Sequence, residues 1–592
     1  MLYQVELRPS TTTSGRKSGD ASEYRCPLAG SAKVPGGRVV QFAQVSADDA
    51  AVEPRRPQAL DAGLFLLVAG LPLAVFPLAR QPFADPKLAV LLLGTVLLWL
   101  AGTGVDRRLG VPAAMWATVC VVAALAGADP AGSVLGPWDS TGLLLLLASA
   151  ALLPVASAVP ARAWDRAGGW LVWVAVAVAV VAVAWRLAPD ALGGTVKDLS
   201  FDGSTLGNPV FAVALLSAAI PAAVASRWSE RRLAFVLVLI ASGLAVNGER
   251  SSLILPAVAL VTCIWPSRAL RRRVAVAAGV VLATIALWGL ASPVLPDGGL
   301  RQAGGQFSTL AGEQDRLAVW SANARSVGER PVFGWGPGLA WSAFVSSATG
   351  EELEVAGRGW ADAHALPLQL LVTTGVVGLL AFALLAWRLL PGLLRPPHPL
   401  AWTAASAIVI GAFSLYEPLN VALTPLLFLF AGAANGERAD VRASASSGLR
   451  PALAPAVALC LAVGLVVSGT ALVASSLEQW SRTHFEPSAI RASVRLMPWR
   501  LSATERYAIE LALDGRAGDP AAAAEARQLI AGAVDDHPWD PGVRLIAADV
   551  EMLLRNPAGV QPWIDDHLER FPNDDVAPPP PEDLAADVVP AA

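Results

Sequence analysis

One histidine has a sequence context that suits proton transfer. His364 lies in the stretch Ala-His-Ala-Leu-Pro, directly before a long apolar run. An imidazole at the start of a helix lies near the positive end of the helix dipole, which favours the neutral form. A neutral imidazole can take a proton from a hydroxyl group near neutral pH. His364 is therefore a candidate general base, and an interfacial capping role is the plainer alternative.

Two arginines have the chemistry to bind phosphate. Arg250 lies in a very short turn between two apolar runs, and Arg316 lies in the stretch Asp-Arg-Leu-Ala-Val-Trp. A guanidinium keeps its charge and can bind a phosphate through two parallel N–H groups. Two of them at a membrane surface could hold a diphosphate. The alternative is that they pair with Glu249 and Asp315 or with lipid headgroups.

A dense run of glycines and prolines lies between Arg316 and His364. Residues 331–338 read Pro-Val-Phe-Gly-Trp-Gly-Pro-Gly, a composition that specifies a fixed, tight backbone path. Their spacing matches neither a dinucleotide fingerprint nor a phosphate-binding loop. The acidic stretch Glu351, Glu352, Glu354 and Asp362 matches no metal template and is interpreted as a solvated loop. We expect no metal site and no cofactor.

The elements that must position these residues are apolar helices. Of the 592 residues, 54% are hydrophobic and only 16% are charged, against roughly 25% charged in soluble domains. A helix needs about 20 apolar residues to cross a bilayer. With a net charge of −4, nothing indicates a nucleic-acid partner. Thirteen apolar runs fall near residues 60–79, 87–104, 111–128, 140–159, 167–187, 207–226, 232–247, 251–265, 273–294, 364–390, 400–416, 418–434 and 452–474.

The charges in the short loops predict the orientation of these runs. Loops that are cytoplasmic if the N-terminus is inside carry 18 arginines, whereas the opposite short loops carry 5 arginines and lysines. Positive charge favours the cytoplasmic side. We therefore expect a cytoplasmic N-terminus, and an odd number of spans places the C-terminus outside. Arg250, Arg316 and His364 all lie on the outer side in this topology.

The sequence thus predicts an all-α membrane helix bundle of about thirteen transmembrane helices, surrounded by membrane lipids. Residues 503–513 and 520–534 are Ala-rich and helical in pattern, and Pro-Trp or Pro-Asn pairs recur at 498, 538 and 572. These pairs are spaced 40 and 34 residues apart. A 34-residue period of helix pairs resembles degenerate tetratricopeptide repeats, which bind protein partners, and an arbitrary small helical domain is the alternative. The expected domains are a disordered cytoplasmic tail (1–57), the transmembrane domain (58–474) with an extracytoplasmic loop (295–363), an extracytoplasmic helical domain (475–573) and a disordered tail (574–592).

Several motifs, taken in order, resemble the O-antigen ligase and polymerase superfamily over residues 200–435. The histidine is followed by Ala365 where the family often has asparagine, and Ile254 stands where the family has leucine. The matching elements are Gly207-Asn208-Pro209, Glu249-Arg250-Ser251, Arg316 with Trp320, the glycines and proline at Pro331, Gly334, Gly336 and Gly338, and His364 followed by Gly375 and Gly378. In sequence spacing, His364 and Gly375 are about three helical turns apart, so we expect them on one helix face, with the glycines allowing close helix approach.

This resemblance implies a metal-independent glycosyltransferase on the outer face of the cytoplasmic membrane. The donor would be a glycan on a polyprenyl diphosphate lipid, and the acceptor a hydroxyl group on a glycan, lipid or protein. His364 would be the catalytic base, and Arg250 and Arg316 would bind the donor diphosphate. Ligation, polymerisation and protein glycosylation share this fold and donor.

Two other functions remain open at the level of sequence. A transporter or flippase of lipid-linked glycans would have similar helices, but transporters often show two similar halves, and no such repeat is visible. A scaffold would use the bundle only as an anchor for the repeat-like tail, which would recruit an envelope protein. A scaffold would need neither His364 nor the two arginines.

The predicted topology can be tested with reporter fusions placed after Arg56, within residues 308–312 and after Asp575. We expect a cytoplasmic signal from the first fusion and an extracytoplasmic signal from the other two, because of the arginine asymmetry. Cytoplasmic signals from the last two would refute the thirteen-helix topology.

Overall fold

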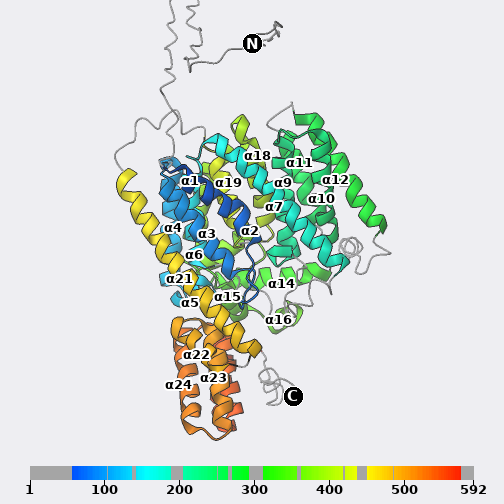
Figure 1. Ribbon diagram of the computed structural model, residues 1–592. Coiled ribbons are helices and arrows are strands. Elements are labelled where there is room, and N and C mark those ends of the chain that lie inside the picture. The colour runs from blue at the N-terminus through cyan, green and yellow to red at the C-terminus, as the bar shows by residue number, and fades with distance from the viewer. Residues whose placement is uncertain are drawn as a thin grey trace, which may run out of the picture. The chain divides into compact units, whose positions relative to one another are not determined.

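The computed structural model describes most of the chain. Within the described residues every regular element is a helix and no sheet is present, which confirms the all-α prediction for this part of the chain (Figure 1). The two segments predicted to be disordered, 1–57 and 574–592, lie almost wholly outside the described residues. The described residues are 56–102, 104–136, 142–188, 204–249, 251–264, 270–291, 311–356, 362–417, 420–436, 450–484 and 486–574.

Each of the thirteen apolar runs coincides with a helical segment. Among the described residues, five helices are long and apolar enough to cross a membrane, namely α4, α7, α12, α17 and α21. Several shorter apolar helices accompany them, as in a multi-pass membrane protein. The segments are α1 to α2 with an intervening π-helical turn (Pro57–Leu73), α3 (Asp85–Ala101), α4 (Arg107–Ala126), α6 (Leu143–Ala156), α7 (Ala161–Leu187), α9 (Pro209–Ala225), α10 (Glu230–Asn247), α11 (Ser251–Ile264), α12 (Arg271–Ala291), α17 (Leu366–Leu394), α18 (Ala401–Ser414), α19 (Leu423–Ala433) and α21 (Arg450–His484).

The bundle has an aromatic core and an apolar outer surface. Trp116 of α4 is fully buried and stacks on Phe428 of α19 with ring centroids 5.4 Å apart. On α12, by contrast, Leu287 and Leu290 are 66% and 78% exposed. Apolar side chains that point outward in this way are unfavourable in water but suit a lipid environment.

A break in α17 receives the glycine-proline segment 331–338. Gly375 interrupts the helix with φ 68° and ψ −173°, a conformation that is essentially restricted to glycine. The break leaves carbonyl groups free for other partners. The backbone N–H of Trp335 donates to the carbonyl of Val372 at 2.8 Å, and that of Gly336 donates to Thr373 at 3.0 Å.

Only glycine fits where the two backbones meet. A Cβ atom on Gly375 would lie 2.2 Å from the carbonyl oxygen of Val332, and one on Gly334 would lie 2.5 Å from that of Val372. The expectation that Gly375 allows close helix approach is therefore corrected: it breaks the helix, and its neighbour is a loop segment. Since α17 begins at Leu366, His364 also precedes the helix and does not share a helical face with Gly375. Gly378 lies in the continuing helix, covered by the side chain of Thr374.

The C-terminal region forms five further helices. The two stretches predicted to be helical fall in α23 and α24, and the recurring Pro-Trp and Pro-Asn pairs lie in turns that follow the ends of α22, α24 and α26. Assignment as tetratricopeptide repeats stays a prediction. The helices are α22 (Pro487–Leu496), α23 (Leu501–Arg516), α24 (Pro520–Asp536), α25 (Pro541–Leu553) and α26 (Pro557–Arg570).

These C-terminal helices contact the rest of the protein through side chains distant in sequence. His537 Nδ1 lies 2.6 Å from the carboxylate of Asp129, and both residues are buried. Trp539 packs edge-on against Trp335 of segment 331–338, with centroids 5.3 Å apart. Helix α21 packs along α3 and leads into α22 (Figure 1). The loop that fits into α17 is thus also a contact point for the C-terminal helices.

We predict that Gly375→Ala destabilises the protein. Alanine in this conformation costs roughly 1–3 kcal/mol before any steric clash is counted. Gly279→Ala is the control, because Gly279 lies in α12 and a Cβ there would meet no atom within 4 Å. Thermal unfolding of the purified proteins should show a lower midpoint for Gly375→Ala only; equal midpoints would contradict the role assigned to this glycine.

Candidate active site

A buried carboxylate joins two of the residues selected from the sequence. Glu417, which follows the end of α18 at Ser414, is 5% exposed. One of its oxygens accepts a hydrogen bond from Nη2 of Arg316 at 2.7 Å. His364 Nδ1 lies 3.2 Å from the same carboxylate. A buried charge is costly unless it is paired, and here two cationic or donor groups from distant parts of the chain satisfy it.

Local sequence fixes the position of His364. Its backbone has φ 45°, in the left-handed region that histidine adopts more readily than most residues. The side chain of Asp362 accepts a hydrogen bond from the backbone N–H of His364 at 2.8 Å, which closes an Asx turn. Gln369, one turn into α17, accepts from the backbone N–H of Ala363 at 2.8 Å. Hydrogen bonds to Asp362, before α17, and to Gln369, within it, therefore fix the backbone at His364.

Arg316 reaches the cluster from α14 (Ala311–Ser326). Its guanidinium lies 5.9 Å from the ring centre of Tyr416, next to Glu417. The side chain is 32% exposed. Because a guanidinium has five N–H donors, its bond to Glu417 leaves the capacity for another anionic partner. Pairing with Asp315 was the alternative to phosphate binding, and the carboxylate that pairs with Arg316 in the structure is that of Glu417.

Arg250 lies outside the described residues, but its neighbours are placed. Ser251 begins α11 and lies beside Tyr416, and Glu249 is within electrostatic range of the same tyrosine. Both serines that follow residue 250 are buried. Glu249 and Ser251 therefore lie near Tyr416, the residue that precedes Glu417.

The other motif residues have structural positions. Gly207 has φ 75° and packs against Phe83, and Asn208 caps α9 by accepting from the backbone N–H of Val210 at 2.9 Å. Trp320 lies one turn after Arg316 on α14 and is 37% exposed. The structure thus brings Arg316 and His364 together, whereas the Gly-Asn-Pro motif shapes a helix start.

One residue of the acidic stretch before His364, Glu352, forms an ion pair within the loop. This residue lies in α16 (Gly350–Ala356), and its partner is Arg325. Although burial acts to raise the pKa of Glu352, hydrogen bonds from Arg325, Ser321 and the Thr349 backbone lower it to about 2. Among the described residues, no group of three or more potential ligands is arranged to hold a metal ion.

The cluster has the arrangement of an oriented general base. A carboxylate that accepts from Nδ1–H holds the imidazole in the tautomer whose Nε2 lone pair can take a proton. Asp362 lies 3.4 Å from Nε2, close enough to stabilise the imidazolium that forms. Glu417 is not among the residues selected from the sequence. Its signal was present: an ionisable side chain between two apolar runs is a candidate functional residue by default.

Comparison with protein families identifies part of this region. Residues 235–383 match the family model described as O-antigen ligase. This O-antigen ligase family domain includes Arg316, segment 331–338 and His364, and it ends before Glu417. Comparison with curated proteins gives no match.

Proposed function

We propose that this protein transfers a glycan from a polyprenyl diphosphate lipid to a hydroxyl acceptor at the outer face of the cytoplasmic membrane. The observation that carries the proposal is the His364–Glu417–Arg316 cluster, two of whose members lie in the O-antigen ligase family domain. Ligation or polymerisation of surface polysaccharide is the reaction class that the domain implies, and protein glycosylation is the related alternative.

The proposal includes the predicted topology. In this arrangement thirteen helical segments span the membrane, the N-terminus is cytoplasmic, and both the 295–363 loop and the C-terminal helices are outside. The cluster then lies at the outer ends of α17 and α18. The apolar exterior of the bundle supports a position within the membrane, where a polyprenyl chain can pack along it.

The reaction we propose is a direct displacement. The acceptor hydroxyl gives its proton to His364 Nε2 as its oxygen forms a bond to the anomeric carbon of the donor sugar. The bond between that carbon and the diphosphate oxygen breaks, and the polyprenyl diphosphate leaves with the electron pair. Glu417 keeps the imidazole oriented and stabilises its protonated form. No metal ion is needed for these steps.

Arginine supplies the charge that the leaving group needs. As proposed, Arg316 and Arg250 bind the diphosphate, where charge-assisted hydrogen bonds contribute roughly 1.5–3 kcal/mol each. The exposed part of the Arg316 guanidinium supports this role, while its bond to Glu417 links donor binding to the base. A transporter or scaffold would have no use for this linkage, which favours an enzyme.

Transfer by purified protein tests the proposal directly. Full-length protein in nanodiscs, supplied with lipid-linked glycan and a hydroxyl acceptor, should form product in the presence of a metal chelator. General-base assistance contributes roughly 10²–10⁴-fold in rate, so His364→Ala should slow transfer by at least about 100-fold. His364→Gln should be equally slow, because an amide cannot accept the proton.

Substitution of Arg316 tests its proposed role in donor binding. Arg316→Lys keeps the charge but loses the planar fork, so it should raise the KM for donor lipid. Full activity of His364→Ala, or of the glutamine variant, would refute the base assignment. An unchanged donor KM for Arg316→Lys and Arg316→Ala would remove that residue from the donor site.

A further inference from the structure

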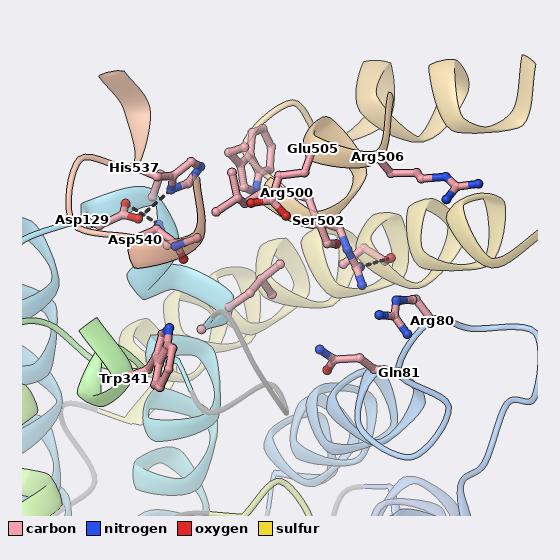
Figure 2. Close-up of a pocket in the computed structure, with 18 of the residues that line it drawn as sticks. Arg80, Gln81, Asp129, Trp341, Arg500, Ser502, Glu505, Arg506, His537 and Asp540 are labelled. Atoms are coloured by element: carbon pink, nitrogen blue, oxygen red, sulfur yellow. Dashed lines mark hydrogen bonds and ion pairs between the residues drawn. The ribbon is translucent and has the colours of Figure 1, made fainter. Parts of the chain in front are cut away.

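A second cavity lies apart from the candidate active site. It has a volume of about 610 Å³ and lies between the C-terminal helices and the ends of α3, α5 (Pro130–Leu135) and α15 (Ala340–Ser347). Arg316, His364 and Glu417 do not line it. Figure 2 shows Trp341 and Gln81 on one side, with Glu505, Asp540 and His537 on the other. The volume falls within the range of roughly 300–1,000 Å³ typical of ligand sites.

The positive side chains of this cleft are compensated by ion pairs. Arg500 lies 3.4 Å from Asp85 and 3.7 Å from Glu478. Glu478 is shared with Arg80 at 3.5 Å and with Arg482 at 3.4 Å. Arg506 pairs with Glu510 at 3.1 Å. The cleft therefore offers N–H donors without an excess of positive charge, which is unlike a site for phosphate.

Two carboxyl groups converge on one point in the wall of the cleft. A Cβ atom on Gly542 would lie 3.2 Å from Asp540 Oδ1 and 3.8 Å from Glu505 Oε1. Burial raises the pKa of both carboxyl groups, and the charge of Asp540 adds to the effect on Glu505. Carboxyl groups in such a position accept hydrogen bonds from hydroxyl groups and, when protonated, donate them. Because the nearby guanidinium groups are already paired, an anionic ligand gains no net electrostatic attraction here.

Two indole rings complete the lining. Trp341 of α15 is half-buried, and Trp499, in the turn before α23, is 40% exposed. An indole offers a large, rigid apolar face with an electron-rich surface. The C–H face of a pyranose ring is the complementary surface, while its hydroxyl groups match the carboxyl, amide and guanidinium groups around it.

We propose that this cleft binds a short stretch of uncharged glycan through stacking on Trp341 and hydroxyl contacts to Glu505 and Asp540. Helix α15 links the cleft to the candidate active site, because it packs against α14, which carries Arg316. In this account the cleft holds a glycan segment of the acceptor or product outside the transfer site. That assignment of the bound glycan rests on the proposed function, whereas binding itself does not.

Binding can be measured without any transfer reaction. The full-length protein in nanodiscs is titrated with cellotriose, mannotriose and chitotriose as neutral probes, and with trigalacturonate as an acidic probe, and saturation-transfer NMR gives the affinity. At least one neutral probe should bind with a Kd of roughly 0.1–10 mM, about 3–5 kcal/mol of binding free energy. Trigalacturonate should bind at least about five-fold more weakly than the best neutral probe.

Substitutions on opposite sides of the cleft locate the site. Trp341→Ala and Glu505→Gln should each weaken binding of the best neutral probe by at least about five-fold. If either variant does not fold, Gln81→Ala replaces it, with the same expected loss of affinity. Trp480→Ala is the matched control, because Trp480 is 47% exposed on α21 and does not line the cleft. Its affinity should equal that of the native protein.

The His364→Ala protein separates this inference from the proposed function. It should bind the neutral probe with native affinity although transfer is lost. Absence of saturable neutral binding, tighter binding of trigalacturonate, or equal affinities in Trp341→Ala, Glu505→Gln and Trp480→Ala would overturn the glycan site. Normal transfer by His364→Ala with intact glycan binding would instead overturn only the proposed catalytic role.

Discussion

The pairing of one buried carboxylate organises the candidate active site. Glu417 is nearly removed from solvent, and an unpaired charge there would cost several kcal/mol. Its partners are Arg316, from α14, and His364, from the segment that precedes α17. The three lie far apart in sequence, so their meeting fixes the relative positions of a loop helix, a helix start and a helix end. The imidazole gains its orientation from the same contact.

A second constraint connects this site to the C-terminal helices. Segment 331–338 can enter the break in α17 only because Gly334 and Gly375 have no side chains. Trp335 in that segment then packs on Trp539, and Asn573 donates to the carbonyl of Ala348 at 2.9 Å. The loop that carries the family motifs is thus held on one side by a membrane helix and on the other by the C-terminal region. Displacement of either α17 or the C-terminal region would therefore also change the position of His364.

The sequence predicts helices far better than it predicts their contacts. Apolar runs become helices because backbone groups without water must bond within their own segment, so all thirteen coincide with helical segments. The start of α17 at Leu366, just after His364, also follows from local residues. Spacing alone, however, places Gly375 on a helical face, and the break depends on a loop about 40 residues earlier. Glu417 escapes notice because its partners, Arg316 and His364, are 101 and 53 residues away.

The central claim is that Glu417 acts through His364, and a double-mutant cycle on the transfer rate tests it most directly. Glu417→Gln alone should slow transfer, because the amide accepts from Nδ1–H but stabilises the imidazolium poorly. In the His364→Ala background the same substitution should have little further effect on the rate. If the two substitutions lower the logarithm of the transfer rate additively, the result would contradict the account and would place Glu417 outside the proton-transfer step.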